Sequence, residues 1–165
     1  MKTLFENKYT RNKEWAKDLY CYIFFKRPIM IILSLAFFAN FVYQIYNAIT
    51  HKGFEWSLAI IVFLWFGYIA ILYAKSVKSV IKRDLEVHSK PIETTVIVTD
   101  ESIKQSTSTG SEIVLNYSDI KKVAKTKKYI YLISKTNMYY TLKRDSFSVG
   151  DEKEIIDFLK NKADI

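Results

Sequence analysis

Histidine, cysteine and glycine are scarce in this chain of 165 residues, which contains two, one and four of them respectively. A single cysteine excludes an intramolecular disulfide, and with two histidines it leaves no set of ligands typical of a zinc site. Four glycines form no Gly-rich phosphate-binding loop. Neither His51 nor His88 has a Ser or Cys neighbour with an Asp or Asn at the spacing of a catalytic triad. The sequence therefore predicts no enzyme, with no catalytic, metal-binding or cofactor-binding residue.

Charge is absent from two long stretches, residues 28–50 and 56–74. As α-helices they would be about 28 to 34 Å long, which matches the hydrocarbon thickness of a bilayer. A charged side chain at that depth costs at least ~2.5 kcal/mol. We expect two transmembrane helices joined by an outer loop, residues 51–55. A cleaved signal peptide is excluded because its apolar core would be shorter, nearer the N-terminus and not followed by a second one.

Basic residues are distributed unevenly around these stretches. The loop holds Lys52 alone, whereas the flanks hold Lys2, Lys8, Arg11, Lys13, Lys17, Lys26 and Arg27 on one side and Lys75, Lys78, Lys82 and Arg83 on the other. The positive-inside rule then predicts a multi-pass protein of the cell membrane with both termini in the cytoplasm. From residue 90 onward 13 basic and 11 acidic residues leave a net charge of +2, so we expect no nucleic-acid partner.

Residues 1–27 are expected to form a cytoplasmic arm followed by an amphipathic helix at the membrane interface. Trp15, Leu19, Tyr22 and Ile23 recur at helical spacing there. Cys21 lies on this helix, where packing against apolar neighbours is favoured over acylation. Residues 75–90 are expected to continue the second membrane helix as an extension or linker, which Pro91 ends.

The pattern changes in residues 91–165 to short β-branched and aromatic runs separated by turn residues. Residues 129–134 are apolar on both faces and predict a central strand. The chain closes with a helix in which Asp151 is the N-cap and Ile155, Phe158 and Leu159 form the buried stripe. We expect a small α+β domain, an antiparallel sheet or partial barrel with one C-terminal helix, similar to pleckstrin-homology (PH) domains.

Polar and small residues within the apolar stretches indicate how the two helices pack. Asn40 lies near mid-depth, where an uncharged amide usually forms a hydrogen bond across a helix interface. Gly67, Ala70 and Ala74 form one small-residue face suited to close approach of the first helix. Neither stretch holds an ionisable group, which argues against a proton or ion transporter.

Five lysines fall within eight residues, and they are Lys121, Lys122, Lys125, Lys127 and Lys128. Lysines on an edge strand discourage edge-to-edge aggregation. The same lysines would attract anionic lipid headgroups, at ~1 kcal/mol each close to the surface. A third interpretation is contact with an acidic patch on a partner protein.

Several segments of the C-terminal half resemble the YcxB-like family of small bacterial membrane proteins. They are residues 98–103, 113–123, 129–133 and 142–147, followed by the helix that starts near Asp151. The resemblance implies the same plan for the whole chain, with an N-terminal arm, two membrane helices and this domain. Leu142 departs from the family pattern, which commonly has Pro there. The resemblance implies no biochemical activity.

These observations favour a non-enzymatic membrane protein that presents a cytosolic PH-like domain to anionic lipid headgroups or to a protein partner. The bilayer is the one partner that the composition itself implies, and a homo-oligomer stays open. The alternative is a self-protection (immunity) protein against a bacteriocin or secreted toxin, because such proteins also combine two membrane helices with a small domain.

Overall fold

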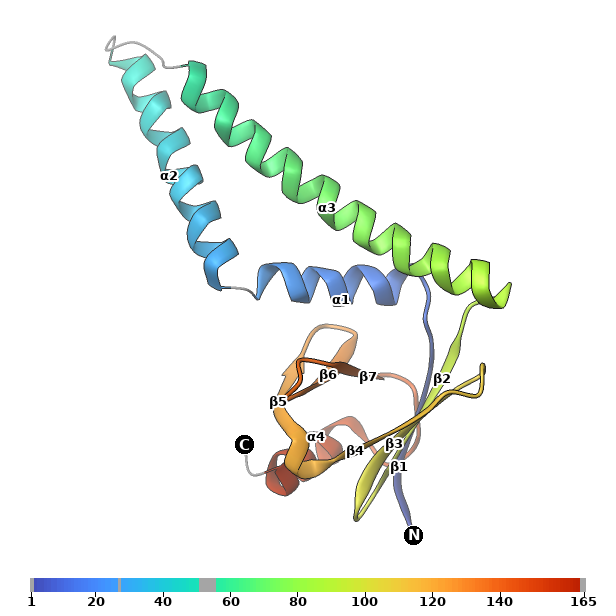
Figure 1. The fold of residues 1–165 in the computed structure, drawn as a ribbon. Helices are drawn as coiled ribbons and strands as arrows, with labels where there is room; N and C mark the ends of the chain where they lie inside the picture. The colour runs from blue at the N-terminus through green and yellow to red at the C-terminus, as the bar shows by residue number, and fades with distance from the viewer. Residues whose placement is uncertain (1, 27, 51–55, 164–165) are drawn as a thin grey trace. The chain divides into compact units, whose positions relative to one another are not determined.

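The computed structural model describes residues 2–26, 28–50 and 56–163, shown as a ribbon in Figure 1. They divide into two compact units, one formed by Met1–Asp18 with Ile81–Ile165 and the other by Leu19–Val80. The predicted outer loop, residues 51–55, lies outside the described residues.

The first unit contains two antiparallel sheets, with strand orders β4-β3-β2-β1-β8 and β5-β6-β7. The strands are β1 (Thr3–Thr10), β2 (Glu93–Thr99), β3 (Ser102–Thr107), β4 (Glu112–Asn116), β5 (Ile120–Lys125), β6 (Tyr129–Ser134), β7 (Tyr139–Lys143) and β8 (Phe147–Val149). A 3-10 turn, η1 (Tyr117–Asp119), joins β4 to β5. The predicted antiparallel sheet with short strands is confirmed.

Strand β1 changes the predicted boundary of this domain. The residues expected to form a short polar or extended arm form a strand that pairs with β2, from Thr3 opposite Thr99 to Thr10 opposite Glu93, and also with β8. Phe5, Asn7 and Tyr9 alternate with more exposed residues and are buried, which is the period of a half-buried strand. The domain therefore includes the N-terminus as well as residues 91–165.

The side chain of Asn7 joins the two sheets. Asn7 is fully buried, its Nδ2 donates to the carbonyl oxygen of Lys143 at 2.7 Å, and its Oδ1 accepts from the Lys143 N–H at 2.9 Å. Asn7 thus forms hydrogen bonds with both the N–H and the C=O of Lys143, the last residue of β7. In a continuous sheet a neighbouring strand would form these bonds.

Strand β6 lies at the centre of its sheet, as predicted, and all six of its residues are buried.

The predicted C-terminal helix, α4 (Glu152–Ala163), is also confirmed. The Asp151 carboxylate accepts from the N–H groups of Lys153 and Glu154 at 2.7 and 2.9 Å, so Asp151 is the N-cap. Ile155 and Leu159 are fully buried. Gly150 precedes this cap with a φ of 74°, and a Cβ there would clash with the ring of Phe5.

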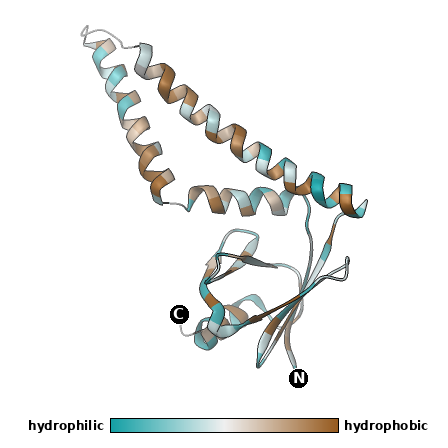
Figure 2. Cartoon of the chain, in the orientation of Figure 1, coloured by the Kyte–Doolittle hydropathy of each residue, from teal (hydrophilic) through white to brown (hydrophobic). Residues whose placement is uncertain are grey.

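Three helices complete the chain: α1 (Lys13–Phe25), α2 (Pro28–Ile49) and α3 (Trp56–His88). Two segments, Pro28–Ile49 and Ala59–His88, are long and apolar enough to cross a membrane. Figure 2 shows the apolar residues that run along α2 and α3. Helix α3 continues unbroken through the predicted extension and ends before Ser89, which has a φ of 58°.

Aromatic and polar residues mediate the packing between α2 and α3. The rings of Phe37 and Trp65 lie 5.1 Å apart between centroids, and Gln44 is 2% exposed. Gly67, Ala70 and Ala74 are exposed, and a Cβ on Gly67 would meet no atom within 4 Å. The predicted small-residue face is therefore not where these two helices meet. Ala70 instead lines an apolar pocket between α1 and α3 within the second unit.

We predict that Asn7→Ala destabilises the domain by about 1 to 3 kcal/mol, because it removes two hydrogen bonds between the sheets and leaves the N–H of Lys143 without its side-chain acceptor. Chemical unfolding of the full chain in detergent, followed by near-ultraviolet circular dichroism, measures this. Asn161→Ala, at an exposed position in α4, is the matched control and should change stability by less than ~0.5 kcal/mol. Equal stability of the two variants would contradict the bridging role of Asn7.

Candidate functional site

The five predicted lysines lie on β5 and in the turn that follows it. Strand β5 is an edge strand of its sheet, and its pairing with β6 shifts register between Ile120 and Lys122. A bulge of this kind interrupts the alternation of side chains. Lys121 and Lys122 are consequently both exposed, although they are neighbours in a strand.

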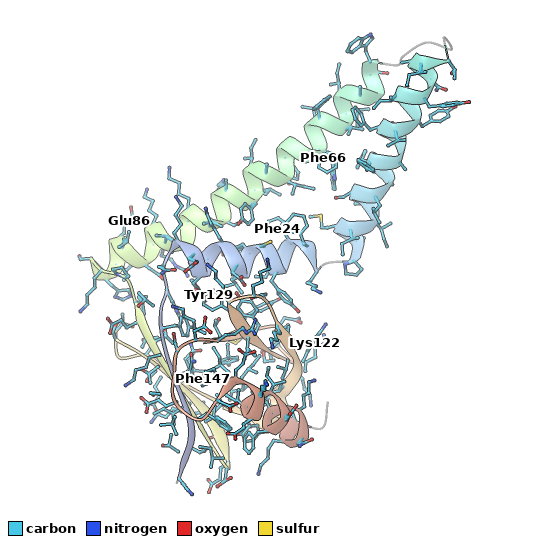
Figure 3. All side chains as sticks on the ribbon, turned by 180° about the vertical axis from the view of Figure 1, so that it is seen from behind. Phe24, Phe66, Glu86, Lys122, Tyr129 and Phe147 are labelled. Carbon is cyan, nitrogen blue, oxygen red and sulfur yellow. The ribbon has the colours of Figure 1, made fainter. Side chains whose placement is uncertain are left out.

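Two of the five lysines form ion pairs within the domain. Lys125 Nζ lies 2.6 Å from Glu152 on α4, and Lys128 pairs with Glu14 on α1. Within the part of the chain that the structure describes, Lys121, Lys122 and Lys127 form no ion pair, and all three are exposed. We call these three residues the free lysine surface; Lys122 is labelled in Figure 3.

Arg144 fixes the turn that carries Lys127 and Lys128. Its Nη1 donates to the carbonyl oxygens of Lys127 at 2.8 Å and Thr126 at 3.2 Å, while its Nε donates to Glu152 at 2.7 Å. The hydrogen bond from Arg144 lowers the pKa of Glu152, and the bond from Lys125 lowers it further. Sequence reasoning used Arg144 only as part of the family resemblance, since a turn held by a distant guanidinium leaves no local pattern.

The first turns of α1 contact the sheet β5-β6-β7. Asn12 caps this helix, because its Oδ1 accepts from the N–H of Trp15 at 2.9 Å. Trp15 is buried, and its Nε1 donates to Thr141 on β7 at 3.2 Å. Trp15 was expected to lie at the lipid interface, and the structure places it against the domain instead.

Asp18 completes this contact. Its Oδ1 accepts from the hydroxyl of Tyr131 at 2.7 Å and from Thr126 Oγ1 at 2.8 Å. Tyr131 is fully buried, and this burial, reinforced by the hydrogen bond to Asp18, raises its pKa. Burial raises the pKa of the neighbouring Tyr129 to about 12. Both phenols are therefore protonated at neutral pH, and Tyr131 acts as the hydrogen-bond donor.

Titratable groups that could perform chemistry are dispersed. Among residues 2–26, 28–50 and 56–163 there is no group of three or more His, Cys, Asp or Glu side chains that could hold a metal ion. Cys21 is free and exposed. Asn40 is partly buried on α2, apart in sequence from the lysines, and belongs to the other unit. The lysine-rich strand is thus the one predicted site whose members the structure brings together on a surface.

We predict that Asp18→Ala destabilises the domain by about 2 kcal/mol, because the buried Tyr131 hydroxyl loses its charged acceptor. Urea unfolding of the full chain in detergent measures the change. Asp157→Ala, an exposed carboxylate on α4, is the control. In a double-mutant cycle, Tyr131→Phe should cost less stability in the Asp18→Ala background than in the wild type, because the hydrogen bond to Asp18 is already lost. Equal costs in the two backgrounds would show that this hydrogen bond is not the cause.

A second prediction concerns acid. Because the pKa of Glu152 is lowered in the folded state, its contribution to stability is complete above the usual pKa of 4.5 and disappears as the pH falls through the lowered value. Glu152→Gln should therefore lower stability at neutral pH and flatten the loss of stability between about pH 5 and about pH 3. Unfolding free energies at several pH values test this. Glu154→Gln, exposed on the same helix, should keep the wild-type slope.

Comparison with known proteins identifies the domain but supplies no activity. Residues 98–159 match the family model described as YcxB-like protein. No curated protein and no solved structure matches the chain. The matched residues begin within β2 and end within α4, so β1 lies outside them. Leu142, where the family commonly has Pro, is fully buried within β7, opposite Ile130. The resemblance seen in the C-terminal half of the sequence is confirmed over residues 98–159, which are less than half of the chain.

Proposed function

We propose that this chain is a non-enzymatic membrane protein in which α2 and α3 span the cell membrane and hold the YcxB-like domain at the cytoplasmic surface. There the domain interacts with anionic lipid headgroups through the free lysine surface. The single observation that carries this proposal is the set of three exposed lysines on the edge strand β5 and its turn that form no ion pair with any described residue.

The exposure of apolar side chains supports membrane insertion. Ile29 on α2 is 67% exposed and Phe63 on α3 is 69% exposed, and most residues of both candidate spans share this condition. Stable soluble monomers rarely expose apolar surfaces of this extent to water. Lipid surrounds such side chains without cost, so a bilayer accounts for them most simply.

The pairing of β1 with β2 supports the predicted topology. Residues 3–10 precede the α2–α3 hairpin and residues 93–99 follow it, yet they are neighbours in one sheet. Two strands of one sheet lie on the same side of a membrane, as an even number of spans requires. The positive residues that flank the spans favour the cytoplasmic side.

The arrangement of the domain supports its description as PH-like. Two antiparallel sheets are followed by a single C-terminal helix, and that helix contacts η1 and β5. This likeness is one of overall plan alone and by itself assigns no activity. Self-protection against a toxin stays a prediction, because no feature of the described residues favours it.

The lysine surface can be tested with the full chain in nanodiscs of phosphatidylcholine, mixed with vesicles that contain phosphatidylglycerol. We predict that the wild-type chain sediments with the vesicles at low salt. Replacing Lys121, Lys122 and Lys127 with Gln should weaken this binding at least ~10-fold, because each lysine near the surface contributes ~1 kcal/mol. High salt should abolish the binding of the wild type.

The matched control replaces Lys2, Lys153 and Lys160 with Gln, which removes the same charge from exposed positions outside β5. This variant should bind almost as well as the wild type. If both triple variants bind equally, net charge rather than the β5 surface attracts the lipid. If the wild type does not bind at all, the lipid proposal fails and an acidic protein partner takes its place.

Topology is tested by labelling single cysteines in intact cells with a membrane-impermeant maleimide. In a Cys21→Ser background we predict that Thr50→Cys, next to the predicted outer loop, is labelled from outside. Ser118→Cys, exposed in η1, should be labelled only after the cells are permeabilised. Labelling of Ser118→Cys in intact cells would reverse the proposed orientation.

A further inference from the structure

A polar pocket of about 350 Å³ lies in the first unit, between the last turns of α3 and the sheet that contains β1. Its lining includes Arg83, Asp84 and His88 from α3, Gln105 from β3, and Arg11, which directly follows β1. Glu86, labelled in Figure 3, marks the turns of α3 that contribute to it. The pocket shares no residue with the free lysine surface.

Two side-chain oxygen atoms of residues that line this pocket are buried and have no hydrogen-bond partner within the described chain. They are Asp84 Oδ2 and Gln105 Oε1, and the two residues are 6% and 5% exposed. Buried polar groups in folded proteins are nearly always paired, because desolvation without a partner is costly. A carboxylate is the most costly case, since it carries a full charge. Both atoms accept hydrogen bonds, so a partner must donate them.

Arg11, in contrast, has a buried donor, Nε, that lacks an acceptor within the described chain. The residue is fixed on two sides, because its backbone N–H donates to Ile92 at 2.9 Å and its guanidinium lies 5.5 Å from the centre of the Trp15 ring. Arg83, also cationic and exposed, lines the same pocket. The residues that line the pocket thus leave two acceptor oxygens without a donor and one donor nitrogen without an acceptor among the described residues.

We propose that this pocket binds a small zwitterion in which a primary ammonium lies a few bonds from an anionic group. The ammonium donates to Asp84 and Gln105, and the anionic oxygens accept from Arg11 and Arg83. Such a ligand satisfies both buried oxygens and the free guanidinium nitrogen at once, which neither a simple cation nor a simple anion does. Two sources share this chemistry: a free amino acid and the headgroup of an ethanolamine phospholipid.

The test measures the thermal stability of the full chain in a neutral detergent with a series of soluble probes. O-phosphoethanolamine and serine represent the two sources, and ethanolamine and inorganic phosphate each carry half of the chemistry. Phosphocholine is the sharpest control, because its quaternary ammonium has no N–H to donate. We expect a saturable rise in melting temperature with O-phosphoethanolamine or serine, and none with phosphocholine, ethanolamine or phosphate.

A matched pair of variants places the binding. Asp84→Asn keeps the shape of the side chain and should weaken binding of the active probe at least tenfold. Glu86→Gln, on the same helix but with its carboxylate paired to Lys82 on the exposed side, should bind like the wild type. A response to O-phosphoethanolamine alone assigns the headgroup, and a response to serine alone assigns the amino acid. If neither probe stabilises the wild type, or if phosphocholine does so equally, the proposal is overturned whether or not Asp84→Asn folds.

Discussion

The pairing of β1 with β2 is the contact on which the rest of the structure depends. It joins residues 3–10 to residues 93–99 and so closes a loop that contains α1, α2 and α3. Closing a loop of that length costs conformational entropy, which the long strand pair and the buried side chains of β1 must offset. The domain is therefore complete only when β1 has returned to it, and a fragment limited to residues 98–159 lacks β1 and most of β2, which are neighbours in its larger sheet.

Polar side chains at a few buried positions then hold the parts of the domain together. Asn7 connects the two sheets by pairing both backbone groups of Lys143, and Asp18 attaches α1 to β6 through Tyr131. Each is a long-range contact that pairs polar groups in a buried or partly buried position. The ion pairs of Lys125 and Lys128 contribute little to the stability of the domain, because both lysines remain largely exposed. Their pairing matters mainly because it removes two lysines from the charge available to a partner.

The sequence is sufficient to predict the elements with strong local patterns, and insufficient for those that depend on distant partners. The central strand at 129–134, the Asp151 cap and the two apolar helices follow from periodicity, capping and the absence of charge. Strand β1 escaped prediction because Glu6, Asn7 and Lys8 make it read as polar, although Asn7 is buried. The small-residue face at Gly67 was misplaced because large rings, rather than small residues, lie where α2 and α3 meet. The polar pocket had no signal, since Arg11, Asp84 and Gln105 are far apart along the chain.

Helices α1 and α3 each contribute to both units of the chain, and each carries an acidic residue that the domain uses. Asp18 lies in the half of α1 that packs on the sheet, and Asp84 lies in the last turns of α3, beside the polar pocket. Both carboxylates therefore belong to the first unit, although each stands on a helix whose other end belongs to the second unit. The first unit is thus assembled from segments that precede and follow the two apolar helices, and its buried polar contacts join residues that are far apart along the chain.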